Sequence, residues 1–282
     1  MSPGALTGGS RVDFRNQFDL QVFEEIYPQN GVTGRALYKV RDLNTNLFYA
    51  LKTFDLGCND RHEIEKEVLS LNKADLGHIA PKCRALSFNG NEARLLMDWV
   101  EGKTFAQEFP EPPEDVFDLR KRVAKLQELC FSVDRIHAKN IFHRDLKPEN
   151  IIISPEGNPG LTVRLIDFGL SLQKRQKGQA EGSAFRAPEQ DDRRDFNLRT
   201  QADIFALGKI GWWLFTGKNP QLYVDESTCA DWENLERLDL CQECLFANKS
   251  LEKALKTAMA YEPKKRYRHA RLLGMALKES KV

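Results

Sequence analysis

The sequence predicts an α+β fold in which the strands come first and the helices follow. Residues 37–54 and residues 85–99 each consist of two strand-like runs joined by an Asn-rich turn, which is typical of antiparallel hairpins. The apolar residues of 116–136 then recur every three or four positions, and residues 203–215 are apolar almost all round. These patterns predict a long helix with one buried stripe and a second helix in the centre of its lobe.

The remaining elements are expected in chain order. Residues 14–27 lead into the first strand, and residues 60–73 form an amphipathic helix. The long helix should end near Asn140, because Asn tolerates the left-handed conformation of a helix cap. Residues 251–260 and 268–278 are predicted to close the chain as two helices.

Composition bounds the class of protein. The 282 residues suffice for a sizeable core, so one or two lobes are expected. The 42 basic and 41 acidic residues leave a net charge of +1, which gives no indication of nucleic-acid binding or of an acidic membrane surface. We find no apolar run of about 18 residues that would span a membrane, and no apolar signal core at the N-terminus.

Six cysteines are scattered through the sequence, and only Cys241 and Cys244 form a CxxC pair. A metal site would need two more ligands, and only Cys229 lies nearby in sequence. Reduced, structural cysteines in a cytoplasmic setting are therefore expected.

Residues 141–153 hold the candidate chemistry. The polar run HRDLKPEN lies between apolar residues on both sides, which is typical of a rigid loop pinned by buried flanks. The run places an acid, a cation and an amide at fixed offsets: Asp145, Lys147 and Asn150. Phosphate transfer needs such a set, to accept a hydroxyl proton, neutralise the moving phosphate and hold magnesium. The alternative is a charged surface turn.

These eight residues match the catalytic loop of protein kinases, and the sequence resembles the eukaryotic-type (Hanks-type) Ser/Thr protein kinase family. A lysine two residues after Asp145 resembles the Ser/Thr-specific branch. The resemblance covers residues 14–278 and implies a bilobal fold, with a small antiparallel sheet and one main helix in the first lobe and mainly helices in the second. The expected segments are a flexible N-terminal segment (1–13), the N-lobe (about 14–97), a hinge (98–102) and the C-lobe (about 103–278).

The resemblance also implies the reaction and the ligands. ATP would bind with Mg²⁺, or with Mn²⁺, between the lobes, and its γ-phosphate would pass to Ser or Thr of an unidentified protein substrate or of the chain itself. Asp145 would deprotonate the hydroxyl, Lys147 would support the γ-phosphate and Lys52 the α- and β-phosphates. The implied nucleotide-contacting residues are Gly31, Gly34, Leu37, Ala50, Lys52, Met97 (as gatekeeper), Asp98, Val100, Ile152 and Asp167.

Lys52 needs a buried partner if it has this role, because an unpaired lysine is costly to bury; an exposed sheet lysine is the alternative. The family requires a glutamate from the helix that follows. Three compete: Glu63, Glu65 and Glu67. Glu67 is favoured because an apolar residue follows one turn later, and Glu65 is the runner-up.

Two strands, 151–153 and 163–166, are predicted to pair as a hairpin. A hairpin brings the residues at its open end together, here Asn150 and Asp167. An amide and a carboxylate suit a magnesium ion that also binds phosphate. Asp167 begins the Asp-Phe-Gly triplet, which in the family binds metal, and its Phe168 is expected to be a buried support, as is His143.

Two segments depart from the family pattern. The glycine-rich loop has Arg35 at the place of the third glycine, so its cover of the phosphates is expected to be looser or altered. The activation segment, residues 170–186, contains no Thr or Tyr, and its serines are Ser171 and Ser183. We therefore expect a segment that is ordered without phosphorylation, with Glu181 as the anionic partner of Arg144.

Three further residues are expected to hold the C-lobe together. Glu189 of Ala-Pro-Glu is expected to pair with a buried arginine, best matched by Arg266. Asp203 is expected to cap its helix and to bond the backbone of the catalytic loop.

Two other functions compete with an active protein kinase. A pseudokinase that acts as a scaffold or switch is favoured only by the irregular glycine-rich loop, since Lys52, Asp145 and Asp167 are all present. A small-molecule kinase is disfavoured by Ala-Pro-Glu together with Asp203 and Arg266, which belong to peptide-binding kinases. The oligomeric state stays open.

Overall fold

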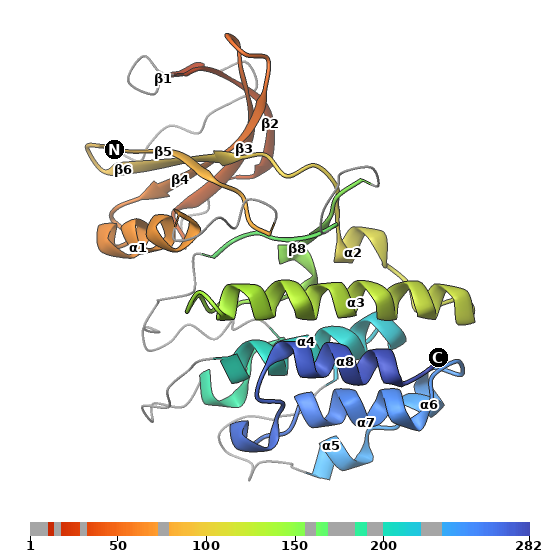
Figure 1. Cartoon of the computed structure of the whole chain (residues 1–282). Coiled ribbons are helices and arrows are strands. Elements are labelled where there is room, and N and C mark those ends of the chain that lie inside the picture. Colours follow the sequence, from red (N-terminus) through yellow and green to blue (C-terminus); the bar gives the residue numbers. More distant parts are fainter. Residues whose placement is uncertain are drawn as a thin grey trace. The chain divides into compact units, whose positions relative to one another are not determined.

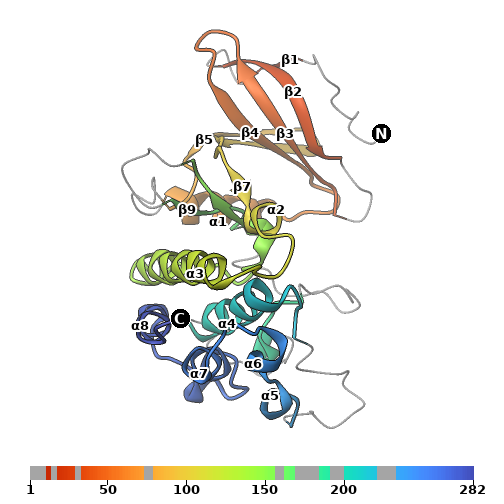
Figure 2. The same ribbon diagram turned by 90° about the vertical axis from the view of Figure 1, so that its right-hand side faces the viewer.

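The computed structural model describes residues 11–13, 18–28, 33–72, 79–155, 162–168, 184–190, 200–220 and 233–282. The chain divides into two units, Met1–Glu101 and Gly102–Val282 (Figures 1 and 2). The first holds the larger sheet and the second holds most of the helices, so the predicted α+β class is confirmed.

The first unit contains a six-stranded antiparallel sheet in the order β1-β2-β3-β4-β6-β5, with one helix, α1. Both predicted hairpins are confirmed, as β3–β4 and β5–β6. The elements are β1 (Arg11–Asp13), β2 (Asp19–Tyr27), β3 (Arg35–Asp42), β4 (Phe48–Asp55), α1 (Arg61–Asn72), β5 (Cys83–Asn89) and β6 (Glu92–Asp98).

One face of this sheet forms the unit's hydrophobic core. Side chains of β3 alternate between half-buried and buried, as expected for a strand whose neighbouring residues point to opposite faces. The residues on the buried face come from four strands. They are Leu20, Val22, Ala36, Tyr38, Val40, Tyr49, Leu51 and Leu96. The opposite face carries Lys52 and the residues described with it below.

The expected flexible segment 1–13 needs a correction. Residues 11–13 form β1, which pairs with β2 through Val12 opposite Leu20. An edge strand offers a row of unpaired backbone groups to any neighbouring segment, whatever its side chains. Three residues are too few to show a periodic pattern, so this strand could not be predicted from the sequence.

The second unit is built around α3, which packs against α4 and α8, while α7 also packs against α4 and α8 (Figures 1 and 2). A small sheet, β7-β8-β9, completes it. The elements are β7 (Lys103–Thr104), α2 (Phe105–Glu108), α3 (Val116–His137), β8 (Ile151–Ile153), β9 (Val163–Leu165), α4 (Thr200–Thr216), α5 (Glu233–Arg237), α6 (Leu240–Glu243), α7 (Lys249–Ala258) and α8 (Ala270–Glu279). No helix in the described ranges combines the length and the apolar character needed to cross a bilayer.

Helix α3 has the predicted ends. Asp115 caps its first turn by accepting a hydrogen bond from the Asp118 N–H at 2.7 Å. Beyond its last turn Asn140 takes a φ of +56°, the left-handed conformation expected of it. The short elements β7 and α2 were not predicted, although Thr104 and Gln107 form a capping box with a recognisable sequence signature.

Gly102 allows β7 to reach β8. Its φ is +138°, and a Cβ at this position would lie 2.1 Å from the carbonyl oxygen of Ile153. Only glycine permits so close an approach of the two backbones. Thr104 then pairs with Ile152 in the small sheet.

Helix α4 is buried almost all round, as predicted. It begins at Thr200, so Asp203 lies inside its first turn and is not the cap that we expected. Lys209 is the exceptional residue: although it is basic, it is only 6% exposed, and its Nζ donates to the carbonyl oxygen of Ala184 at 2.5 Å. Burial lowers the pKa of Lys209 to about 8.

The predicted pair of Glu189 and Arg266 is confirmed. The guanidinium donates to both carboxylate oxygens, at 2.6 and 2.8 Å, and both side chains are buried. Arg266 also donates to the carbonyl oxygens of Ala260, Gln201 and Tyr261. The arginine therefore ties the segment around Glu189 to α4 and to the chain between α7 and α8.

Substitution Lys209→Met should raise the free energy of unfolding more at pH 7 than at pH 10. Between about pH 8 and 10.5 the unfolded chain keeps a proton on this amine that the folded chain has released, so wild-type stability rises with pH across that window. The shift corresponds to about 3 kcal/mol. Urea unfolding of both proteins at the two pH values measures it, and an equal difference at both would contradict a costly buried charge.

Substitution Arg266→Ala should lower the free energy of unfolding by about 3–5 kcal/mol, because it leaves the carboxylate of Glu189 buried without its partner. Lys265→Ala is the matched control. It breaks an exposed pair with Glu262, whose side chains are 68% and 59% exposed, and should cost less than about 1 kcal/mol. Denaturant titrations that gave equal losses for the two variants would refute the buried-pair interpretation.

Candidate active site

In the first unit, four of the expected nucleotide-contacting residues share one face of the sheet. Leu37 of β3 lies opposite Lys52 of β4, and Met97 of β6 lies opposite Ala50 of β4. Directly opposed residues of antiparallel strands point to the same face, as do residues two apart on one strand. This face is the one opposite the hydrophobic core, and Ala50, Lys52 and Met97 are buried on it.

Lys52 forms a buried ion pair with Glu67 of α1. Its Nζ lies 3.1 Å from Glu67 Oε1, and the two side chains are 3% and 5% exposed. Glu65, the runner-up, instead pairs with Arg61 at the exposed surface of the helix, at 3.0 Å. The prediction that Glu67 is the partner is confirmed as a contact, and Lys52 is not an exposed sheet lysine.

The expected hinge begins with Asp98, the last residue of β6. The Asp98 N–H donates to the Lys82 carbonyl at 3.0 Å, so any bond from the Asp98 backbone to an adenine must use its carbonyl oxygen. The Asp98 carboxylate is held by Arg84. Val100 is buried. Gly31 lies outside the described residues.

In the second unit, the 141–150 loop gathers its three candidate residues. Asp145 is only 4% exposed. Its Oδ2 lies 3.4 Å from Lys147 Nζ, and the Asn150 amide donates to this oxygen at 3.3 Å and to the Asp145 carbonyl at 2.9 Å. No hydrogen bond or ion pair from the described part of the chain engages Asp145 Oδ1. One carboxylate oxygen is thus compensated, while the other has no partner among the described residues.

The backbone of this loop is held by Asp203 of α4. Its carboxylate accepts hydrogen bonds from the N–H groups of His143, at 2.9 Å, and Arg144, at 2.6 Å, and lies 2.8 Å from His137 Nε2. Burial opposes ionisation of Asp203, but the hydrogen bond and the electrostatic attraction of His137 outweigh it and hold the pKa of this carboxyl below its ordinary value. The predicted bond to the loop backbone is confirmed.

The supports beneath the loop are also as expected. Phe168 is fully buried, and its ring centroid lies 4.7 Å from that of His143. Nε2 of His143 lies 3.0 Å from the Ile166 carbonyl oxygen. These contacts connect the 141–150 loop to the segment that carries Asp167.

The β8–β9 hairpin brings the two expected metal ligands to one end. Ile151 pairs with Leu165, and the Ile166 N–H continues the ladder by donating to the Asn150 carbonyl at 2.9 Å. Asp167 is therefore the residue after the one paired with Asn150. Its φ of +61° is unusual for a non-glycine residue and turns the chain at the end of the hairpin.

Gln190 is a contributor that the sequence analysis missed. Its side chain accepts a hydrogen bond from the Ala187 N–H at 2.9 Å and donates to the Arg144 carbonyl oxygen at 2.8 Å. It thus fixes the 141–150 loop from the side opposite Asp203. Nothing in the sequence distinguishes a glutamine after Ala-Pro-Glu from an exposed one. The predicted roles of Ser171, Glu181 and Ser183 concern residues outside the described ranges.

Among the described residues, Cys241 but not Cys244 belongs to a group of possible metal ligands. Cys241 lies close to the carboxylates of Asp239 and Glu252. Lys249, however, already forms ion pairs with both, at 3.0 and 3.2 Å, and Cys244 is buried. The Lys249 ammonium group therefore already compensates the charge of both carboxylates.

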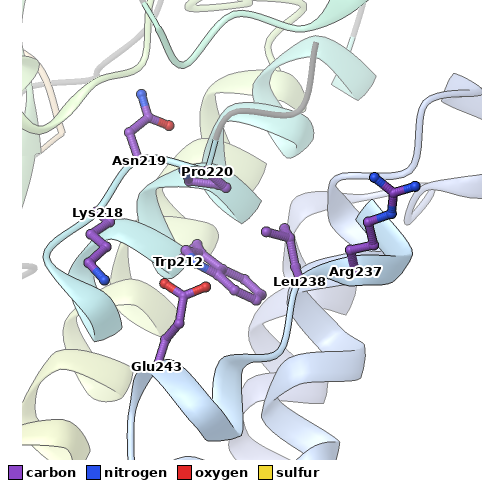
Figure 3. Close-up of a pocket in the computed structure, with 7 residues that line it drawn as sticks. All are labelled: Trp212, Lys218, Asn219, Pro220, Arg237, Leu238 and Glu243. Atoms are coloured by element: carbon purple, nitrogen blue, oxygen red, sulfur yellow. The ribbon is translucent and has the colours of Figure 1, made fainter. Parts of the chain in front are cut away.

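A cavity of about 340 Å³ lies elsewhere in the second unit (Figure 3). Trp212 and Leu238 contribute its apolar wall, and Lys218 and Glu243 add charged groups. None of the three candidate residues of the 141–150 loop lines it, so it is not the proposed site of chemistry.

Comparison with known proteins also points to a protein kinase. The family model described as "Protein kinase domain" matches residues 30–275. The chain is 32% identical over 142 residues to serine/threonine-protein kinase PknL of Mycobacterium tuberculosis, covering 47% of this chain and 33% of that protein. It is 31% identical over 132 residues to the probable serine/threonine-protein kinase PknB of Lactococcus lactis, covering 45% and 20%. These matches thus span a third or less of either relative.

Solved structures agree on the fold. The kinase domain of Mycobacterium tuberculosis PknI superposes with a TM-score of 0.70 at 22% identity, covering 98% of this chain and 99% of that one. A likeness at this identity shows the fold alone, whereas the family match extends over most of the sequence. The chain therefore belongs to the protein kinase domain family.

Proposed function

We propose that the chain transfers the γ-phosphate of Mg-ATP to Ser or Thr hydroxyls of a protein substrate. The arrangement around Asp145 carries the proposal. A buried carboxylate with one oxygen compensated and the other available is suited to orient a hydroxyl and to accept its proton. Phosphoryl transfer otherwise requires mainly positioning and neutralisation of charge.

The cations have separate tasks in this proposal. Lys147 is a third exposed and lies beside Asp145, where it can support the transferred phosphate. Lys52 is held rigidly by Glu67 on the sheet face that carries Leu37, Ala50 and Met97, where it can support the α- and β-phosphates.

The hairpin end fits a magnesium ion. The Asn150 nitrogen is occupied by Asp145, which leaves its Oδ1 as a possible metal ligand next to the segment of Asp167. Amide and carboxylate oxygens are the ligands that magnesium prefers. When bound, the metal would supply positive charge to the phosphate oxygens, and Asn150 and Asp167 would hold it.

Two further features belong to the same proposal. The proposal that the substrate is a protein is supported by two contacts. The Glu189–Arg266 pair and Gln190 order the segment next to the 141–150 loop. A cytoplasmic setting is supported by the free cysteines in the described part of the chain, since thiols persist in a reducing compartment.

The test is transfer of radiolabelled phosphate from Mg-ATP to generic Ser/Thr substrates and to the chain itself. Asp145→Asn should lower the rate at least about 100-fold, the usual contribution of a positioned general base. Glu149→Gln is the matched control. It removes an exposed carboxylate four residues away in the same segment and should leave the rate within about twofold of wild type.

Phosphoamino-acid analysis should find label on Ser or Thr. Label on Tyr, or an undiminished rate in Asp145→Asn, would contradict the proposed reaction. Wild-type protein that is stabilised by Mg-ATP against heat but transfers nothing would favour the scaffold function instead.

A further inference from the structure

The residue that breaks the glycine-rich pattern has a specific partner. Arg35 begins β3, and its Nε donates to Asn59 Oδ1 at 2.7 Å. The guanidinium also lies 5.6 Å from the ring centroid of Phe54. The side chain that replaces the expected third glycine is therefore bound to the turn between β4 and α1.

Asn59 is the centre of this contact. The residue is only 8% exposed, and its amide nitrogen donates to the carbonyl oxygens of Thr33, at 2.9 Å, and Asp55, at 3.0 Å. With Arg35 on its oxygen, the amide uses both N–H groups and its acceptor. The buried side chain of Asn59 thus joins the backbone of Thr33, the backbone of Asp55 and the side chain of Arg35.

Gly34 is fitted to the same turn. Its carbonyl oxygen accepts the Asp55 N–H at 2.7 Å. Its φ is +61°, and a Cβ here would lie 2.9 Å from Cys58 Cβ and 3.0 Å from Asp55 Cβ. The need for glycine at this position is thus explained by the turn packed behind it, without reference to a phosphate.

We propose that Arg35 and Asn59 are positioning residues for the nucleotide, which lock the residues following the glycine-rich loop onto the turn that leads into α1. Thr33, Gly34, Arg35, Asp55 and Asn59 are called the Asn59 clamp below. The inference rests on the proposed function, because it assigns the clamp to the same ATP site. It reverses the expectation that Arg35 makes the phosphate cover looser.

The clamp should act on nucleotide affinity more than on the chemical step. Residues 33–35 are ordered before the ligand arrives, so binding does not have to order them. They lie directly before Leu37, on the strand that pairs with Lys52. Because the ordering serves the bound ground state and the transition state alike, its loss should raise KM for ATP with little change in kcat.

Two variants remove different arms of the clamp. Arg35→Ala removes the guanidinium, and Asn59→Asp keeps an acceptor for Arg35 but loses both N–H donors to Thr33 and Asp55. Arg41→Ala is the matched control. Arg41 lies on the same face of β3 as Arg35, and its side chain forms no hydrogen bond or ion pair within the described ranges.

The measurements are KM for ATP and kcat at a saturating protein substrate, with Kd for Mg-ADP by calorimetry. Each clamp variant should raise KM and Kd roughly five- to tenfold and leave kcat within about twofold, while Arg41→Ala changes none of them. Thermal unfolding of each variant without nucleotide verifies that it is folded; if Asn59→Asp is not, Arg35→Ala alone decides.

Unchanged KM and Kd in a folded clamp variant of an active enzyme would overturn the inference and leave the proposed function standing. Wild-type protein that binds Mg-ADP but transfers no phosphate would contradict the proposed function, and Kd alone would then decide on the clamp. Wild-type protein that does not bind Mg-ADP would overturn both.

Discussion

The buried carboxylate of Asp203 is the constraint on which the catalytic loop depends. Both of its oxygens accept N–H groups, from His143 and Arg144 of the loop and from the ring of His137. Arg144 is held at a φ of +63°, a conformation that costs free energy for a non-glycine residue and persists only where its surroundings enforce it. Gln190 holds the Arg144 carbonyl from the other side. The residue before Asp145 is therefore held through both its N–H and its carbonyl group, which fixes the backbone that carries Asp145.

Charge burial is used in two ways within this chain. Lys52 and Arg266 each meet a carboxylate in a buried pair, where removal of one partner would leave an uncompensated charge. Among the described residues, Lys209 has only the Ala184 carbonyl oxygen as its partner, so its burial costs stability. The first two pairs fix α1 to the sheet and the Ala-Pro-Glu segment to the helices. The positions of α1 and of the Ala-Pro-Glu segment are thus set by buried ion pairs that do not tolerate the loss of one partner.

Much of this arrangement could be predicted from the sequence. The loop motif, the long stripe of α3 and the apolar α4 carry strong local patterns, and the hairpin argument placed Asn150 beside the segment of Asp167. For the partner of Lys52, three glutamates compete, and Glu67 is favoured by the apolar residue one turn later. The sequence pattern alone does not show which side of α1 faces the sheet, so the contact itself had to come from the structure. The clamp around Asn59 could not be foreseen, since it depends on a turn 24 residues from Arg35. The edge strand β1 and the role of Gln190 could not be predicted for a similar reason. Backbone pairing and a single side-chain hydrogen bond leave no periodic pattern in the sequence.

The most direct test of this account is the turnover of Asp203→Asn. An amide has the same shape as the carboxylate but must turn an N–H toward one of the N–H donors of His143, Arg144 or His137. We expect kcat to fall by about 100-fold through misplacement of Asp145, with Kd for Mg-ADP within about twofold of wild type in a folded protein. A folded variant with kcat within twofold of wild type would show that the loop does not depend on Asp203, and would contradict the account.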